Sequence, residues 1–203
     1  MCDVKAVVRA FDTINDMLID RGLISNRTYM GEEEVKTRLK DSTFNIFDFK
    51  ISDNDYKVTV LFHLRNRFQK QTLNTYRSNI QNDTDEKHVI FVFKDKINAQ
   101  NEKNLKDIYC DVDNFETFCL KNLLFNITRH NLVPKHELVN SVESEEVYRR
   151  YSIKTKQQNI KFPLLLTKSD PVAKYYDFKP GQLVRITRPS SSIGESISYR
   201  FCV

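Results

Sequence analysis

The six consecutive residues His88-Val89-Ile90-Phe91-Val92-Phe93 are the feature that most constrains the fold of this chain. The apolar residues of this run do not alternate with polar ones, as they do in the strands of a half-exposed sheet. Such a run is typical of a strand that is buried on both faces. The sequence therefore predicts a central strand at residues 88–93, in a sheet that is covered on both sides.

Helical and strand patterns alternate around this run. The first helix, at residues 3–20, carries an apolar stripe at helical spacing and ends near Gly22, which can act as a C-cap. Further helices are predicted at 32–39, 68–80 and 101–107, and further strands at 44–49, 56–64, 109–112 and 119–127, with a helical turn at Phe115. This alternation predicts an α/β domain with a mixed sheet.

The composition of the chain changes at one place. All five prolines lie between residues 134 and 189. Residues 1–130 contain 20 Lys/Arg and 20 Asp/Glu, whereas residues 131–203 contain 12 and 7. We therefore predict two domains, 1–130 and 131–203.

The second domain is predicted to be small and α+β. We expect a strand at 135–139, a helix at 143–151 started by Ser141 or Ser144, and mostly irregular structure at 152–168. Asp170 can cap a short helix that begins with Pro171, and Pro180-Gly181 forms a turn. A strand follows, in which Leu183, Val184 and Ile186 face away from Arg185 and Thr187, and a last strand begins near Ser198.

Several classes of function are not indicated. The four cysteines are scattered without a C-x-x-C pair, and the four glycines form no phosphate-binding loop, so neither a metal site nor a cofactor is expected. No apolar run approaches the roughly 18 residues of a membrane span, and no signal peptide is evident. We expect a protein inside the cell that has no membrane partner.

One enzymatic hypothesis can be built on Asp48-Phe49-Lys50. This spacing occurs in metal-dependent nucleases, where Asp41 or Asp20 would add the second carboxylate that Mg²⁺ requires. The tripeptide is common by chance, and a charged strand edge that blunts pairing is the favoured explanation. A Mg²⁺-dependent nuclease is therefore the less favoured alternative, and we predict that the chain is not an enzyme.

Positive charge is concentrated near the C-terminus. Residues 149–200 contain 11 Lys/Arg and 3 Asp/Glu. Such a surface is typical of proteins that bind nucleic acid or an acidic partner, although a solvated basic face has the same composition. A stand-alone nucleic-acid-binding module is accordingly a second alternative.

Six stretches near and within the second domain carry a resemblance to a known family: residues 126–130, 132–136, 170–176, 179–186, 188–190 and 198–200. They resemble the C-terminal assembly domain of the fifth subunit of eukaryotic nuclear RNA polymerases, a domain that archaeal polymerases share. Residues 8–11 and 20–22 resemble the opening helix of the eukaryotic protein. The likeness covers most of the chain and is strongest from Phe125 onward.

The resemblance implies a noncatalytic structural subunit of a multisubunit DNA-directed RNA polymerase. In the family the N-terminal domain forms a jaw beside downstream DNA, and the C-terminal domain docks on the largest polymerase subunit. The expected compartment is the nucleus for a cellular polymerase, and the virion or host cytoplasm for a viral one.

The resemblance also implies site residues. Lys94, Lys96 and Lys103 would contact phosphates of downstream DNA, although a solvated lysine cluster explains them equally, and the family's proline- and serine-containing loop is here Ile97-Asn98-Ala99-Gln100. The residues that match the family in the second domain divide into two groups. The candidates for the subunit interface are Arg188, Ser190, Tyr199 and Arg200, and the structural residues are Asp170, Pro171, Gly181 and Gly194.

Overall fold

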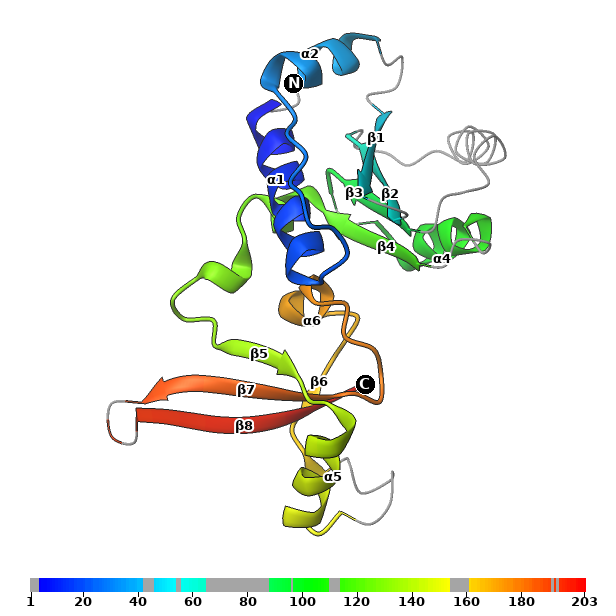
Figure 1. The fold of residues 1–203 in the computed structure, drawn as a ribbon. Helices are drawn as coiled ribbons and strands as arrows, with labels where there is room; N and C mark the ends of the chain where they lie inside the picture. Colours follow the sequence, from blue (N-terminus) through cyan, green and yellow to red (C-terminus); the bar gives the residue numbers. More distant parts are fainter. Residues whose placement is uncertain are drawn as a thin grey trace. The chain divides into compact units, whose positions relative to one another are not determined.

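Two compact units make up the chain, Met1–Phe125 and Asn126–Val203, and each contains a four-stranded sheet (Figure 1). The computed structural model describes residues 4–41, 46–53, 56–64, 88–95, 97–109, 114–153, 161–190, 192 and 194–203. The predicted helix at 68–80 lies outside these residues, as does most of the predicted strand at 109–112. The predicted division into functional domains at residues 130 and 131 stays a prediction.

The sheet of the first unit has the strand order β1-β2-β3-β4. Strand β1 is antiparallel to β2, and the other two pairs are parallel. Strand β3 lies in the middle and is buried at all six positions, which confirms the prediction made from its apolar sequence. The strands are β1 (Ile46–Asp53), β2 (Tyr56–His63), β3 (His88–Phe93) and β4 (Asn114–Cys119).

Helices cover both faces of this sheet. Leu105 of α4 packs against Val89 and Phe91 on one face (Figure 1). On the other face, Arg21 at the end of α1 binds Glu116 of β4. The α-helices in the described part of the first unit are α1 (Val4–Asp20), α2 (Glu32–Asp41) and α4 (Ala99–Ile108). Their positions confirm the three predicted helices at 3–20, 32–39 and 101–107, and with them the mixed α/β class.

Helix α1 ends in a Schellman motif. The N–H of Gly22 donates to the carbonyl of Ile19 (2.8 Å), and the N–H of Leu23 donates to the carbonyl of Leu18 (2.9 Å). Gly22 has a φ of 71°, which glycine adopts without strain. The predicted C-cap is confirmed, and the motif places Arg21 at the edge of the sheet.

A buried ion cluster joins α1 to the sheet. The guanidinium of Arg21 binds both carboxylate oxygens of Glu116 on β4, with N–O distances of 2.5 and 2.9 Å. The Nε2 of His88 on β3 lies 2.8 Å from one of those oxygens. Burial by itself raises the pKa of Glu116, but hydrogen bonds from Arg21 and His88 outweigh it and lower the pKa to about 2. The carboxylate therefore stays ionised inside the fold.

The predicted strand at 119–127 and the helical turn at Phe115 are wrong. Phe115 lies in β4, opposite Val89 of β3, and its ring stacks on Tyr109 at a centroid distance of 5.0 Å. The chain then leaves the sheet in two 3₁₀ turns, η1 (Leu120–Leu123) and η2 (Ile127–Arg129). The apolar residues of η1 are buried against α1 rather than paired in a strand, so apolarity alone gave the wrong element.

The sheet of the second unit has the strand order β5-β7-β8-β6. Strand β7 is antiparallel to both β5 and β8, whereas the two-residue strand β6 is parallel to β8. Strands β7 and β8 form a long hairpin (Figure 1). The strands are β5 (Lys135–Leu138), β6 (Leu164–Leu165), β7 (Leu183–Ser190) and β8 (Gly194–Cys202).

The two α-helices among the described residues of this unit, α5 (Ser141–Arg150) and α6 (Pro171–Tyr175), pack on opposite faces of the sheet. We call these the α5 face and the α6 face. Val184 and Ile186 are buried with Ala173 of α6, and Leu183 is buried with Val147 of α5. Leu183 therefore shares the α5 face with Arg185, which corrects the prediction that it faces the other way.

Short polar side chains start both helices. The side chain of Asn140 accepts a hydrogen bond from the N–H of Glu143 (2.8 Å) and caps α5, so the predicted caps Ser141 and Ser144 are wrong. The carboxylate of Asp170 accepts hydrogen bonds from the N–H groups of Val172 and Ala173, at 2.9 and 3.0 Å, and caps α6.

Within the described residues, no helix has the length and apolarity needed to cross a membrane.

Glu116 makes the stability of the first unit depend on pH. Because its folded pKa of about 2 lies below the ordinary 4.5, its ionised form stabilises the fold fully above pH 4.5, and this stabilisation is lost as the pH falls toward 2. We expect Glu116→Gln to lower the free energy of unfolding at pH 7 by about 3 kcal/mol and to flatten its pH dependence between 4.5 and 2. Denaturant unfolding over a pH series measures both effects.

The matched control is Glu102→Gln, because that carboxylate forms a partly exposed pair with Lys106 at 3.3 Å. We expect it to cost less than about 1 kcal/mol. An acid profile that Glu116→Gln leaves unchanged would contradict the stabilising role of this cluster.

Candidate functional site

The first candidate surface follows strand β3. Lys94 is half-buried directly after this strand, and its backbone N–H donates to the carbonyl of His63 (3.1 Å). Lys103 is exposed on α4, whereas Lys96 lies outside the described residues. The structure therefore places two of the three predicted phosphate contacts on the connection from β3 and on the helix that follows it.

Carboxylates reduce the positive charge around these lysines. Lys121 pairs with Asp95 at 3.2 Å, and Lys106 pairs with Glu102 at 3.3 Å. Within the described part of the chain, Lys103 has no carboxylate at ion-pair distance. Such a surface can attract a phosphate backbone through a few long side chains, and any binding would be sensitive to salt.

The second candidate surface lies on the β7–β8 hairpin. Residues that face each other across an antiparallel pair share one face of the sheet, and side chains alternate along each strand. Arg188 and Ser190 continue the row of Val184 and Ile186 along β7, and Arg200 lies opposite Val184. Three of the four predicted interface residues therefore lie on the α6 face.

Tyr199 is separated from the other three interface candidates. It lies opposite Arg185, and thus on the α5 face. Its ring meets that of Tyr151 edge-on, at a centroid distance of 6.3 Å. The sequence places Tyr199 next to Arg200, but the alternation of the strand sends the two side chains to opposite faces.

The arginines of the two faces differ in their ionic partners. On the α5 face, Arg185 binds Glu143 at 2.8 Å and Glu137 at 3.1 Å. In the described residues, neither Arg188 nor Arg200 has a carboxylate at ion-pair distance. The α6 face of the hairpin therefore carries positive charge that is not compensated within the described chain, and we call Arg188 and Arg200 the arginine pair.

His136 on β5 lies on the same face, opposite Ile186. Its Nδ1 is 2.8 Å from the carbonyl oxygen of Pro134. Burial is the largest cause and lowers the pKa of His136, whereas the hydrogen bond with Pro134 and the charge of Asp170 raise it. The charges of Arg200 and Arg188 lower it further, and the net shift is downward. The sequence did not single out His136 as a site residue, because its position beside the arginines depends on the pairing of β5 with β7.

The outer part of the hairpin stands free of the flanking strands. Strand β5 pairs with β7 only as far as Thr187, and β6 pairs with β8 only at Phe201 and Cys202. All residues from Gly194 to Ser198 are exposed, and Ile197 retains 52% of its accessible surface. No sequence signal marked this segment, because its exposure results from the short length of its neighbours.

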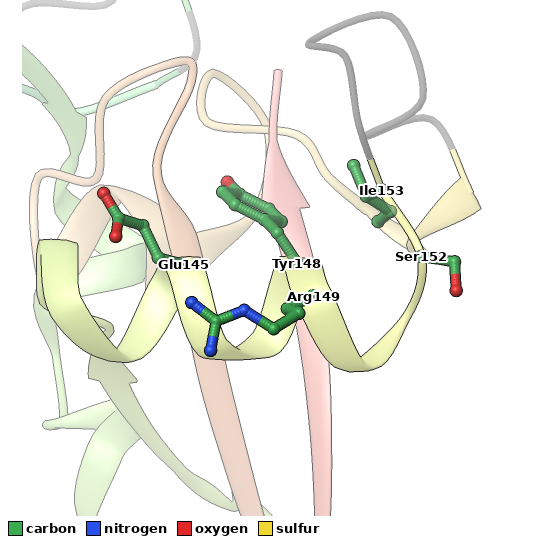
Figure 2. A pocket seen from close by; sticks show the side chains of 5 residues that line it. All are labelled: Glu145, Tyr148, Arg149, Ser152 and Ile153. Carbon is green, nitrogen blue, oxygen red and sulfur yellow. The ribbon is translucent and has the colours of Figure 1, made fainter.

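An open groove of about 450 Å³ lies along the end of α5. Figure 2 shows that Glu145, Tyr148 and Arg149 extend from the helix, and that Ser152 and Ile153 follow it. Burial raises the pKa of Tyr148. The described residues contain no group of three or more His, Cys, Asp or Glu side chains that could hold a metal ion.

Comparison with known proteins identifies the family. Residues 125–202 match the family model for the C-terminal domain of RNA polymerase Rpb5. Over its whole length the chain is 30% identical to the DNA-directed RNA polymerases I, II, and III subunit rpabc1 of Dictyostelium discoideum, and the alignment covers 100% of both proteins. The chain belongs to the Rpb5 family.

Other relatives agree with this assignment. The DNA-directed RNA polymerase V subunit 5C of Arabidopsis thaliana is 31% identical over 97% of this chain and 83% of its own length. The DNA-directed RNA polymerases I, II, and III subunit RPABC1 of Caenorhabditis elegans is 40% identical over 88 residues, which are 43% of this chain and 39% of that protein. The predicted resemblance is thereby confirmed.

Membership of the Rpb5 family also answers the question of catalysis. The family is a noncatalytic component of DNA-directed RNA polymerase, so the prediction of a transcription subunit that is not itself an enzyme is confirmed. The nuclease hypothesis built on Asp48 and Lys50 is set aside. Their side chains lie outside those that the structure describes, and Asp20 is exposed at the end of α1.

The arrangement of the arginine pair around His136 can be tested by titration. Since both arginines lower the pKa of His136, we expect Arg188→Gln and Arg200→Gln each to raise it. Proton NMR of the imidazole ring over pH 5 to 8 measures the change. Arg150→Gln, on exposed α5, is the control and should leave the pKa unchanged. A pKa that neither hairpin substitution moves would contradict their proximity to His136.

Proposed function

We propose that the second unit docks this chain on the largest subunit of a multisubunit DNA-directed RNA polymerase. The observation that carries the proposal is the full-length similarity to the Dictyostelium polymerase subunit. The match to the Rpb5 C-terminal domain covers residues 125–202, which include the arginine pair. In this role residues 131–203 form the assembly domain, and other polymerase subunits are the partners.

The chemistry of the α6 face suits a protein partner. An arginine guanidinium can bind a carboxylate through two parallel hydrogen bonds, and it is more weakly hydrated than a lysine ammonium. The arginine pair is available for such contacts, whereas Arg185 is already occupied by Glu137 and Glu143. The hydroxyl of Ser190, 3.2 Å from that of Ser192, adds hydrogen-bonding capacity at the tip of the hairpin. Tyr199 borders this interface from the α5 face.

We also propose that the first unit, as the jaw domain, lies beside downstream duplex DNA. Lys94, Lys96 and Lys103 would neutralise backbone phosphates in a contact that is weak and independent of sequence. The exposure of Lys103 and the position of Lys94 support the proposal. The mechanism is positional and needs no cofactor and no membrane. The compartment would be the nucleus in a eukaryotic cell, and the virion or host cytoplasm for a viral polymerase.

Affinity isolation tests the docking proposal. We expect the tagged full-length chain to co-purify in stoichiometric amounts with the two largest polymerase subunits. The double variant Arg188→Glu, Arg200→Glu should lose most of this association, because it reverses both charges of the arginine pair on the proposed surface. Mass spectrometry after size exclusion measures the stoichiometry.

The matched control is Lys161→Glu, Lys168→Glu, which makes the same change of charge at two exposed positions of the second unit. We expect this control to assemble like the wild type. A wild-type chain that runs as a free monomer of about 24.0 kDa in native extracts would refute the proposed function.

Salt dependence tests the DNA contact. In polymerase that contains this subunit, we expect the double variant Lys94→Gln, Lys103→Gln to weaken the binding of downstream duplex DNA at low salt. The slope of log K against log salt should fall by about 0.9 for each phosphate that is no longer neutralised. Fluorescence anisotropy with labelled duplex measures the slope. Lys36→Gln, on α2, is the control, and equal slopes for all three proteins would contradict the contact.

A further inference from the structure

The outer edge of β8 is open over most of its length. In the sheet order β5-β7-β8-β6, strand β8 pairs with β7 from Gly194 to Phe201. On its other side, β6 pairs only with Phe201 and Cys202. From Gly194 to Arg200, no other strand of the described chain lies against this edge.

Three hydrogen bonds determine which backbone groups point to the open edge. The N–H groups of Phe201 and Val203 donate toward β6, to the carbonyls of Pro163 and Leu165, both at 3.0 Å. The N–H of Cys202 donates in the other direction, to the carbonyl of Gln182 (2.9 Å). Since backbone direction alternates along a strand, the odd-numbered residues face outward. The N–H and C=O groups of Glu195, Ile197 and Tyr199 therefore point to the open edge.

This edge lacks most of the features that usually prevent strand pairing, and Glu195 is the one charged residue between Gly194 and Tyr199. Natural edge strands are protected by lysine, proline or a bulge. The free part of β7 has such protection, because Pro189 has no N–H and, by the same alternation, its nitrogen faces away from β8. Residues 194–199 contain no proline or lysine, and their register with β7 is unbroken. The edge of β8 is thus a regular template for one more strand.

We propose that an extended, acidic segment of another RNA polymerase subunit pairs with the open edge of β8 as an additional strand. Backbone hydrogen bonds to Glu195, Ile197 and Tyr199 would supply affinity, and alternate side chains would supply specificity. On the α6 face, carboxylates of the added strand would meet the arginine pair. On the α5 face, apolar side chains would cover Ile197. The inference rests on the proposed function, because it names how the partner subunit binds.

Charge decides between a different subunit and a second copy of this chain. Two copies of β8 that paired about Ile197 would bring both arginine pairs onto one continuous face. Residues 126–203 carry 13 Lys/Arg against 7 Asp/Glu, so the two units would also repel each other. An acidic segment removes this repulsion and compensates the arginine pair, which favours a partner of a different kind.

Substitution of Ile197 by proline tests the pairing. Proline removes the outward N–H and places its ring on the open edge, while the hydrogen bonds between β7 and β8 are retained. The control Ile197→Ala removes the side chain and keeps the N–H. We expect Ile197→Pro to lower association with native polymerase by roughly tenfold or more, and Ile197→Ala to have a much smaller effect. Competition with the wild-type tagged chain measures both ratios.

Hydrogen exchange of the wild-type chain gives a second measurement that does not depend on folding of the proline variant. In the free chain, the amides of Ile197 and Tyr199 should exchange fast, and those of Ser196 and Ser198 slowly, because the latter pair with β7. In assembled polymerase, all four should exchange slowly. Mass spectrometry with fragmentation at single-residue resolution detects the difference.

Each other outcome overturns a specific part of the proposal. Wild-type association of a folded Ile197→Pro variant, or fast exchange of Ile197 and Tyr199 in polymerase, would refute strand addition while leaving the docking function intact. A free wild-type chain that is a dimer, and that Ile197→Pro converts to a monomer, would identify a second copy as the occupant. Failure of the wild-type chain itself to join polymerase would refute the proposed function first.

Discussion

The pairing of β7 with β8 is the interaction on which the second unit depends. Its register buries Val184 and Ile186 on one face and Leu183 on the other, so that one hairpin forms the centre of two small cores. The same register fixes the surface, because Arg188 continues the row of buried residues toward the hairpin tip and Arg200 lies opposite the buried Val184. A slip of one residue would exchange the two faces, and core and candidate interface would be lost together.

The first unit depends on a different constraint, which is that a buried carboxylate must be paired with positively charged or hydrogen-bonding groups. Glu116 is only 11% exposed, and it remains ionised because Arg21 and His88 both bind it. These three side chains come from the end of α1, from β3 and from β4, and they fix the helix against two neighbouring strands. Loss of one partner would leave an uncompensated charge inside the unit, which is more costly than the loss of an exposed ion pair.

The side chains that we propose as functional lie on the surface of the second unit, and they differ from the structural ones in their ionic partners. Where an arginine supports the fold, as Arg185 does, carboxylates of the same unit neutralise it. The arginine pair lies beyond the reach of such groups in the described chain, on a hairpin that extends past its neighbouring strands. The chain belongs to the Rpb5 family, a noncatalytic component of RNA polymerase, and in the function proposed above the arginine pair is the surface that contacts another subunit.

Local sequence determined the elements that short-range physics decides. Helix α1 with its glycine end, the buried strand β3 and the hairpin strands all follow from apolar spacing and from the conformational freedom of glycine. The spacing of Arg188 and Ser190 likewise places them on one face of a strand. The position of β4, the cap at Asn140, the separation of Tyr199 from Arg200 and the open edge of β8 were decided only by the tertiary structure. These features depend on which strands pair, in which register and over what length, and residues far apart in the sequence set all three.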